Sequence, residues 1–352
     1  MTGLHRARLA GIVLAAALVL PGCTVVRTPL GLGPPFLRVA GVVEVSDVAA
    51  TSPPAWDPSA RFLAFGTDDG VWRLALGRPR PRRLASLSSV TEVAWSPDGR
   101  RLAAVADGGL YLVYPDARPA ERLSQSAVVR FPAWDPRGRR LAYVASGVDA
   151  ERLATWDADR GAVRAAVLPA GVAAQAIGWL PDGRALLVAL APGGGEGGLL
   201  VRVEAGPRLT VGPVARLEVM HDPVVDPFGR WIAYVAAAPG GSGGAQEQVV
   251  VARPDGSGRR VLTPPGNYTG VSWAPAGTLI AYGTLLGPDE VAVEIVDVAT
   301  DARLRIADYH PELAMYARSI VTRWSPDGLR IAFGTDTDGG RGPVWVATVE
   351  RR

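Results

Sequence analysis

The sequence contains no lysine, one cysteine and only three histidines among 352 residues. All 37 of its strongly basic side chains are therefore arginines, and the formal net charge is only +3. An all-arginine set indicates a GC-rich coding background. No segment beyond the N-terminus gathers basic residues among aromatic ones, as nucleic-acid-binding surfaces do. We therefore exclude a nucleic-acid partner.

The scarcity of histidine argues against metal or general-base chemistry. His5 lies in the N-terminal segment, so only His221 and His310 remain for the rest of the chain. Catalytic sites of that kind usually combine several His, or His with Glu. We therefore predict no enzymatic activity, no metal and no cofactor, while a site made of carboxylates alone stays open.

The N-terminus has the pattern of an export signal. Arg6 and Arg8 precede an apolar run at residues 9–20, which is 12 residues long, whereas a membrane-spanning helix needs about 20. The only cysteine follows in LPGC, which resembles the lipobox of bacterial lipoproteins and departs from it at Pro21. The resemblance implies a signal peptide over residues 1–22 and lipidation of Cys23. Residues 23–35, rich in Pro and Gly, are expected to form a tether.

One short motif recurs seven times along the chain. WSPDG stands at 95–99 and 324–328, and degraded copies lie at intervals of 39 to 51 residues. A strand pattern precedes and follows each copy, and the Pro-Asp-Gly segment is typical of a tight hairpin turn whose Gly has a positive φ. The repeat tryptophans are Trp56, Trp95, Trp134, Trp179, Trp273 and Trp324, and Val225 fills the same position in the fifth copy. The turn glycines are Gly99, Gly138, Gly183, Gly229, Gly277 and Gly328; Ala60 replaces the first and predicts a different turn there.

Two further strand patterns follow each motif, such as residues 109–115 and 120–125 after the second. Four antiparallel strands per repeat, seven times over, are typical of a β-propeller. The motif resembles the TolB-like subgroup of WD-type repeats over about residues 50–352. We predict an all-β chain with one domain at residues 36–352. Its fold is expected to be a seven-bladed propeller of four-stranded antiparallel blades, with six blades as the alternative and the tryptophans packed between blades.

The ends of the chain predict how the ring closes. Only two strand patterns follow Trp324, so the last blade lacks its fourth strand. Residues 36–43, FLRVAGVV, form an unassigned strand pattern upstream of the first motif. We expect this strand to complete the last blade.

Loop lengths point to a binding surface. The connections between second and third strands are short in the first two repeats and longer in the later ones, and the longest inter-blade segment, 308–320, opens on the same face. Binding residues concentrate on loops that a rigid scaffold positions. The predicted surface lies opposite the Pro-Asp-Gly turns and comprises His221, Tyr268, Tyr309, His310 and Tyr316.

These features favour a non-enzymatic propeller lipoprotein that binds an envelope protein or a small extracellular ligand. We expect a monomer that is exported and lipid-anchored on the outer face of the cytoplasmic membrane or in the periplasm. The TolB-like resemblance implies a role in envelope assembly or transport. The alternative is a propeller enzyme, such as a lyase, a lactonase or a glycan-active protein, with a carboxylate or metal site in the central channel.

Overall fold

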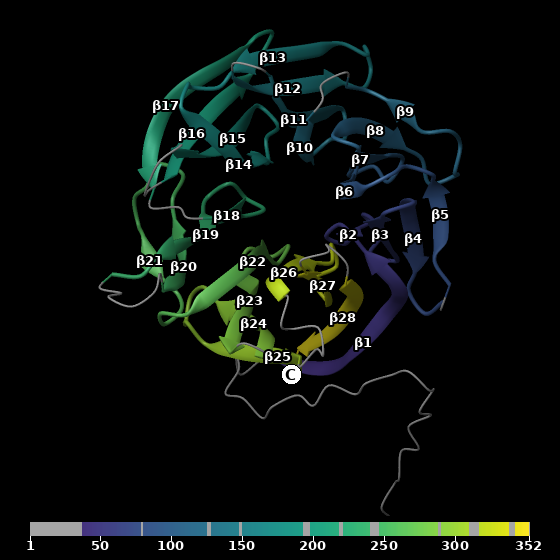
Figure 1. The fold of residues 1–352 in the computed structure, drawn as a ribbon. Helices are drawn as coiled ribbons and strands as arrows, with labels where there is room; N and C mark the ends of the chain where they lie inside the picture. Colours follow the sequence, from purple (N-terminus) through teal and green to yellow (C-terminus); the bar gives the residue numbers. More distant parts are fainter. Residues whose placement is uncertain are drawn as a thin grey trace, which may run out of the picture.

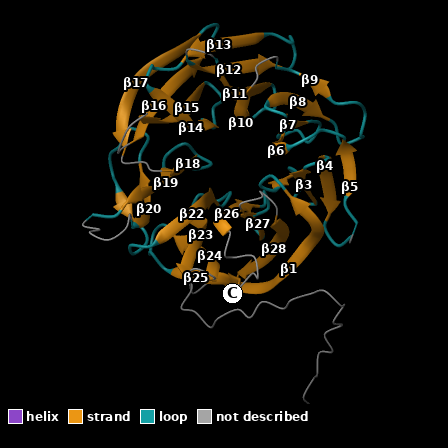
Figure 2. Ribbon diagram, viewed as in Figure 1, coloured by secondary structure: helices purple, strands orange, loops and turns teal. Residues whose placement is uncertain are grey.

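The computed structural model describes residues 37–351, apart from residues 79, 125–127, 148–149, 193–197, 218–220, 240–245, 288–289, 310–316 and 338–341. The described chain forms seven four-stranded antiparallel sheets arranged in a ring (Figures 1 and 2). Its described part contains no helix, and so none that could span a membrane. The predicted seven-bladed all-β architecture is confirmed, and six blades are excluded.

Each sheet is one blade, and its strands follow one another from the innermost to the outermost. Blade 1 contains β2 (Ala55–Trp56), β3 (Phe62–Thr67), β4 (Gly70–Ala75) and β5 (Arg82–Ala85). Blade 2 contains β6 (Val90–Trp95), β7 (Leu102–Ala106), β8 (Gly109–Val113) and β9 (Glu121–Arg122). Blade 3 contains β10 (Val128–Trp134), β11 (Arg140–Ser146), β12 (Glu151–Asp157) and β13 (Val163–Val167). Blades 4 and 5 are β14 (Val172–Trp179), β15 (Ala185–Pro192), β16 (Gly198–Ala205) and β17 (Leu209–Leu217); and β18 (His221–Val225), β19 (Ile232–Ala237), β20 (Glu247–Ala252) and β21 (Arg260–Val261). Blades 6 and 7 are β22 (Asn267–Trp273), β23 (Leu279–Gly287), β24 (Glu290–Asp297) and β25 (Arg303–Tyr309); and β26 (Ala317–Trp324), β27 (Arg330–Thr337), β28 (Gly342–Arg351) and β1 (Leu37–Ala50).

The two ends of the described chain meet in blade 7. β1 is the outermost strand of that blade and runs antiparallel to β28, from Leu37 opposite Arg351 to Ala50 opposite Gly342. The strand predicted at residues 36–43 is therefore confirmed as the closing strand, and it continues to Ala50. Because this pairing joins the start of the chain to its end, the ring closes through a main-chain hydrogen-bond ladder.

The antiparallel order gives the ring two different faces. Connections from the first to the second strand of a blade, and from the third to the fourth, lie on one side, which we call the hairpin face. Connections from the second to the third strand, and from one blade to the next, lie on the other side, which we call the inter-blade face. The Pro-Asp-Gly turns therefore all belong to the hairpin face.

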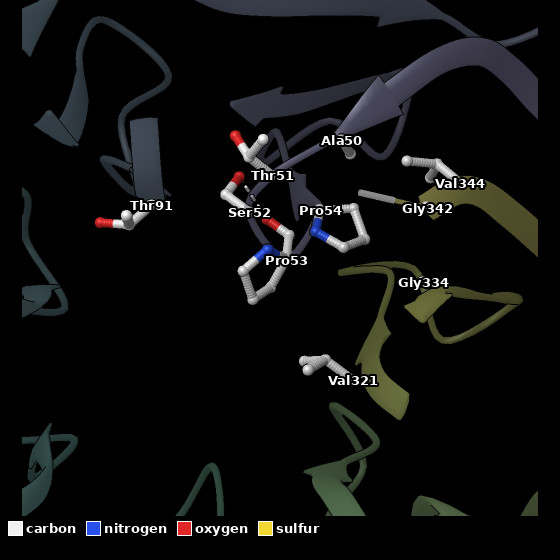
Figure 3. A pocket seen from close by; sticks show the side chains of 10 residues that line it. All are labelled: Ala50, Thr51, Ser52, Pro53, Pro54, Thr91, Val321, Gly334, Gly342 and Val344. Atoms are coloured by element: carbon white, nitrogen blue, oxygen red, sulfur yellow. Dashed lines mark hydrogen bonds between the residues drawn. The ribbon is translucent and has the colours of Figure 1, made fainter. Parts of the chain in front are cut away.

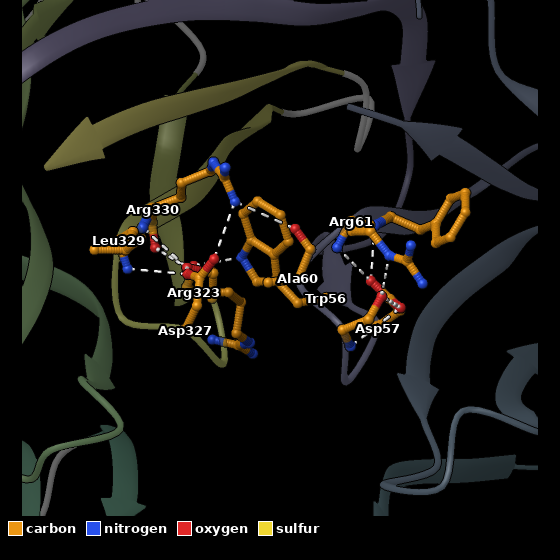
Figure 4. Close-up of polar contacts among 11 residues, drawn as sticks. Trp56, Asp57, Ala60, Arg61, Arg323, Asp327, Leu329 and Arg330 are labelled. Atoms are coloured by element: carbon orange, nitrogen blue, oxygen red, sulfur yellow. Dashed lines mark hydrogen bonds and ion pairs between the residues drawn. The ribbon is translucent and has the colours of Figure 1, made fainter. Parts of the chain in front are cut away.

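The repeat tryptophans join neighbouring blades. The indole N–H of Trp134 donates to the carbonyl of Ala94, at 3.1 Å, and Ala94 directly precedes the Trp position of the preceding blade. The same bond recurs for Trp179 to Ala133 (3.0 Å), Trp273 to Val224 (3.1 Å) and Trp56 to Arg323 (2.9 Å; Figure 4). The last of these bonds joins blade 1 to blade 7. Packing of tryptophans between blades is therefore confirmed, and it includes a directional hydrogen bond.

The hairpins are closed by acceptor side chains at one of two positions. In blade 3, Oδ1 of Asp135 accepts both main-chain N–H groups at the start of the second strand, at 2.7 and 2.9 Å. In blade 2 the task is divided, since Oγ of Ser96 accepts one N–H and Oδ1 of Asp98 accepts the other, each at 3.0 Å. Trp-Asp-Pro and Trp-Ser-Pro-Asp are therefore two chemical solutions to the same turn.

Ala60 adopts the same turn as the glycines. Its φ is 56°, while the six turn glycines have values of 66° to 70°. Its N–H donates to the carbonyl of Asp57 at 3.0 Å, as that of Gly99 does to Ser96 at 2.9 Å. The prediction of a different turn is therefore wrong. A left-handed conformation costs an L-residue about 1–2 kcal/mol, and the Asp57 carboxylate offsets this cost by closing the hairpin (Figure 4).

The contribution of the indole bond can be measured with two matched substitutions. Nε1 of Trp324 is buried and has no hydrogen-bond partner among the described residues, whereas Nε1 of Trp134 has one. Trp134→Phe should therefore lower the free energy of unfolding by about 1 kcal/mol more than Trp324→Phe, because only the first change leaves a carbonyl without its donor. Urea denaturation with an unchanged m-value measures the difference. Equal losses would contradict this role of the bond.

Candidate functional site

Three inner strands share a bulge that contains a residue with a positive φ. The pairing of β10, β18 and β22 with their second strands shifts register at residues 130–133, 221–224 and 269–272. Phe131, Asp222 and Gly270 occupy the bulges with φ of 58°, 53° and 62°. Each stands three residues before the Trp position of its repeat. A bulge releases main-chain N–H groups from the ladder, so they are free to bond across blades.

Carboxylates of the preceding blades accept two of these N–H groups. The N–H of Phe131 lies 3.0 and 3.1 Å from the two carboxylate oxygens of Glu92, in blade 2. The N–H of Gly270 donates to Oδ2 of Asp222, in blade 5, at 2.7 Å. Glu92 and Asp222 stand at the same position of their repeats as the residues that they bind. Polar side chains near the channel therefore tie adjacent inner strands together.

His221 is the centre of a second set of contacts, between blades 5 and 6. Its Nδ1 lies 3.1 Å from Oδ2 of Asp222, and its Nε2 lies 3.0 Å from Oε1 of Glu247. The other oxygen of Glu247 accepts the main-chain N–H of Tyr268 at 3.0 Å. One histidine and two carboxylates of blade 5 thus form a cluster, and its carboxylates accept main-chain N–H groups of blade 6.

The same arrangement occurs between blades 3 and 4 with an arginine in place of the histidine. Arg130 stands four residues before the Trp position, as His221 does, and forms an ion pair with Glu151. Glu151 opens the third strand of its blade, as Glu247 does, and accepts the N–H of Ala174 at 2.6 Å. His221 therefore fills the place of a permanent cation in the repeat.

The electrostatics of His221 agree with that role. Burial alone would lower the pKa of His221, but the hydrogen bonds and charges of Asp222 and Glu247 outweigh it and raise the pKa to about 9. Burial alone would raise the pKa of Asp222, and the bond from His221 instead holds it below the usual value. At neutral pH His221 is therefore an imidazolium beside the Asp222 carboxylate.

A third charged group lies within the channel itself. Burial lowers the pKa of Arg323, while the charges of Asp222 and Glu92 act in the opposite direction. Those two carboxylates belong to blades 5 and 2, each two blades away from Arg323 in blade 7. The Arg323 side chain therefore reaches into the channel between them. Burial also raises the pKa of Glu92, opposed by the Phe131 N–H and by Arg323.

A small cavity opens near the channel between blades 7 and 1 (Figure 3). Its volume is about 160 Å³, and Thr51, Thr91 and Val321 lie on its wall. β2 has only two residues because Pro53 and Pro54, directly before it, have no N–H to donate to a sheet. The shortened inner strand leaves room for a small molecule at this point of the ring.

The structure brings together two of the five predicted surface residues. His221 is partly exposed beside Glu247, and Tyr268 contributes its main-chain N–H to the same glutamate. The Tyr268 side chain is only 4% exposed, packs edge-to-face on Tyr282 at 5.5 Å and donates to a carbonyl, so we no longer assign it to an exposed surface. Tyr309 ends β25, but its side chain lies outside the described part, as do the whole of His310 and Tyr316.

Sequence reasoning missed Glu92, Asp222, Glu247 and Arg323. For Glu92 and Asp222 the signal is a carboxylate three residues before the Trp position, and for Arg323 it is an arginine directly before that position, where other repeats have apolar or small residues. Glu247 is separated from His221 by 26 residues, so this pairing depends on the three-dimensional register of β18 and β20.

Comparison with known proteins supports the repeat and the fold. Residues 82–112 match the family model of the WD domain, G-beta repeat. This stretch covers β5 of blade 1 and β6 to β8 of blade 2, so the repeat is offset by one strand from the blade. The same offset places β1 in blade 7. No curated protein matches the sequence.

Several solved structures share the propeller. TolB from Acinetobacter baumannii is similar with a TM-score of 0.51 and 19% identity over 74% of this chain and 63% of that one. An oligogalacturonate lyase in complex with manganese has a TM-score of 0.68 and 15% identity, over 91% of this chain and 98% of that one. Kuenenia stuttgartiensis hydrazine synthase has a TM-score of 0.63 and 16% identity, over 87% of this chain and 97% of that one. The chain thus spans less than two thirds of the TolB structure. The shared feature is the propeller fold, and the predicted TolB-like and WD-type resemblance is confirmed at that level.

The state of His221 predicts a pH dependence of stability. Because its pKa is raised from 6.5 to about 9, its contribution should be complete below pH 6.5 and should be lost as the pH rises through about 9. Between these pH values the free energy of unfolding, measured by thermal unfolding, should fall by roughly 2 kcal/mol, a value discounted for the partial exposure of the imidazole. His221→Arg, which copies the Arg130 site, should remove this dependence. A variant that keeps the same loss would contradict the assignment.

Proposed function

We propose that the chain is a non-enzymatic binding module, a propeller lipoprotein held outside the cytoplasm by a lipid on Cys23. In this proposal the inter-blade half of the channel receives an envelope protein or a small extracellular ligand. The fold supports the proposal because a closed ring holds groups from several blades in fixed positions around one axis. Envelope assembly or transport is the setting that the TolB-like fold favours.

The observation that carries the proposal is the unused bonding capacity of Arg323. A guanidinium has five N–H donors, and the described residues provide one hydrogen-bond partner for that of Arg323, the carbonyl of Thr322 at 2.9 Å. Glu92 and Asp222 already accept main-chain N–H groups. Arg323 therefore has donors available for a planar carboxylate, which matches the guanidinium in a bidentate geometry.

A propeller enzyme is the alternative, and Glu92 and Asp222 would then be its carboxylates. The pKa of Glu92 is raised by burial and that of Asp222 is lowered, and such a divergence is a pattern found in acid–base pairs. Both carboxylates are, however, bound to the main chain of the next blade. Because both carboxylates serve to hold adjacent blades together, we favour the binding module over an enzyme that would use them for proton transfer.

Arg323→Gln should weaken partner capture while the protein stays folded. Cross-linking in membranes followed by pull-down measures capture, and the melting temperature monitors the fold. We expect a loss of at least about tenfold, because a buried bidentate pair supplies roughly 1.5–3 kcal/mol. Arg323→Lys retains the positive charge beside Asp222 and Glu92 but cannot form the bidentate pair. It therefore tests the bidentate geometry even if the Gln variant is unstable.

Two controls make this experiment decisive. Arg61→Gln removes an exposed arginine from the hairpin face and should leave capture unchanged. Cys23→Ser should release the protein from membranes without changing its affinity for the partner. Retained capture by both Arg323 variants would refute the channel as the binding site.

A further inference from the structure

The described chain begins on the hairpin face. β1 starts at Leu37, opposite Arg351 at the end of β28. Nearby in β28, the N–H of Val349 donates to the carbonyl of Leu329, in the first hairpin of blade 7, at 2.8 Å. The residues between Cys23 and Leu37 can extend at most about 50 Å. A lipid on Cys23 would therefore hold the ring close to the bilayer from its hairpin side.

The hairpin face carries an excess of exposed arginines. In its described loops, the exposed arginines that form no ion pair with a carboxylate are Arg61, Arg78, Arg80, Arg100, Arg137, Arg139, Arg184, Arg208 and Arg253. The exposed carboxylates of these loops without an arginine partner are Asp98, Asp159, Asp182 and Asp255. Most other aspartates of the face are buried against main-chain N–H groups, as Asp135 is, or are paired, as Asp327 is with Arg330.

The arginines are densest between blades 3 and 4. A cleft of about 700 Å³ lies there on the hairpin face. Three arginines that form no ion pair in the described chain line it, Arg137, Arg139 and Arg164, together with two unpaired aspartates, Asp159 and Asp182. Arg140, also in the wall, is bound to Asp135 and to two carbonyls and so is fully engaged. The cleft therefore offers several guanidinium groups to an oxyanion, while its own ion pairs hold its shape.

The same face exposes two large apolar side chains at hairpin loops. Phe228 in blade 5 is 53% exposed, and Leu329 in blade 7 is 48% exposed. Phe228 occupies the place that Asp98 has in blade 2, so an apolar side chain stands where the turn chemistry favours a polar one. Exposed aromatic and aliphatic tips beside arginines are typical of surfaces that lie in the interface of a bilayer.

From these observations we infer that the hairpin face docks on an anionic phospholipid surface. The arginines lie near lipid phosphates, and Phe228 and Leu329 enter the headgroup region. The inference rests on the proposed function for the lipid anchor that brings the protein to a membrane. The arginines and the apolar side chains of the hairpin face are observed without that assumption. Docked in this way, the ring directs its inter-blade face and the Arg323 channel away from the bilayer and toward a partner.

The position of the arginines on one side of the ring favours this attraction. Electrostatic attraction to an anionic membrane falls off within a Debye length, about 8 Å at physiological ionic strength. Arginines on hairpins of the same side can approach the membrane together, which charges on the opposite side cannot do. Binding should therefore depend on which face carries the charge, and it should weaken with salt.

Vesicle sedimentation of residues 24–352, which contain every strand of the closed ring, tests the docking. Binding to phosphatidylcholine vesicles that contain phosphatidylglycerol is expected, with little binding to phosphatidylcholine alone and a loss at high salt. Combined Arg100→Glu, Arg137→Glu and Arg184→Glu should weaken it at least about tenfold. The matched control reverses the charge at three exposed arginines that do not lie on the hairpin face, with Arg83→Glu, Arg122→Glu and Arg152→Glu. Equal losses in both variants, or no binding by the unmodified protein, would overturn the inference.

A site-specific probe reports the orientation directly. Residues 24–352 contain no cysteine, so Phe228→Cys can carry a single environment-sensitive fluorophore. Leu286, 42% exposed at the inter-blade end of β23, provides the control position. Anionic vesicles should shift the emission of the label at 228 to the blue and leave the label at 286 unchanged. The reverse result would overturn the orientation, and neither outcome depends on partner capture through Arg323.

Discussion

The ring depends on one short contact, the bond from an inner-strand indole N–H to the main-chain carbonyl before the Trp position of the preceding blade. An indole has a fixed length, so this bond sets the distance between inner strands at the same level in each pair of blades that uses it. The bond from Trp56 to Arg323 joins residues 267 positions apart and is as short as the others. Closure of the ring between blades 7 and 1 thus uses the same bond as the steps between blades 2 and 3, 3 and 4, and 5 and 6.

Blade 5 shows what happens where the indole is missing. Val225 replaces Trp, and the main chain of blade 4 approaches it through Gly178, where an added Cβ would lie 3.4 Å from the valine. Smaller side chains on both blades thus preserve close packing. The neighbouring pair of blades 5 and 6 has, in addition, the bonds of His221 and Asp222 to Glu247 and Gly270. Close packing thus replaces the indole between blades 4 and 5, while blades 5 and 6 are joined by both the indole bond of Trp273 and these polar contacts.

Much of the fold could be predicted from sequence because its determinants are local. Trp-Asp-Pro and Pro-Asp-Gly encode a turn within five residues, and seven copies specify the ring and its closing strand. The prediction for Ala60 was wrong because the acceptor side chain of Asp57, and not glycine alone, determines that turn. The candidate site was harder to predict from sequence, since the pairing of His221 with Glu247 depends on a bulge at Asp222. Nothing in the residues themselves indicates a bulge, because an aspartate tolerates both extended and left-handed conformations.

The two faces of the propeller follow from opposite demands on the same chain. On the hairpin face, every turn must satisfy the N–H groups at the start of a second strand, so aspartates there are drawn inward and arginines are left in water. On the inter-blade side, inner strands from different blades must be joined, so carboxylates such as Glu151 and Glu247 accept N–H groups of the next blade. A nearly neutral chain thereby acquires a basic face without any basic segment in its sequence. The polarity of the ring is a consequence of how each blade satisfies its main chain, and the docking that we propose would use this polarity to orient the ring at a membrane.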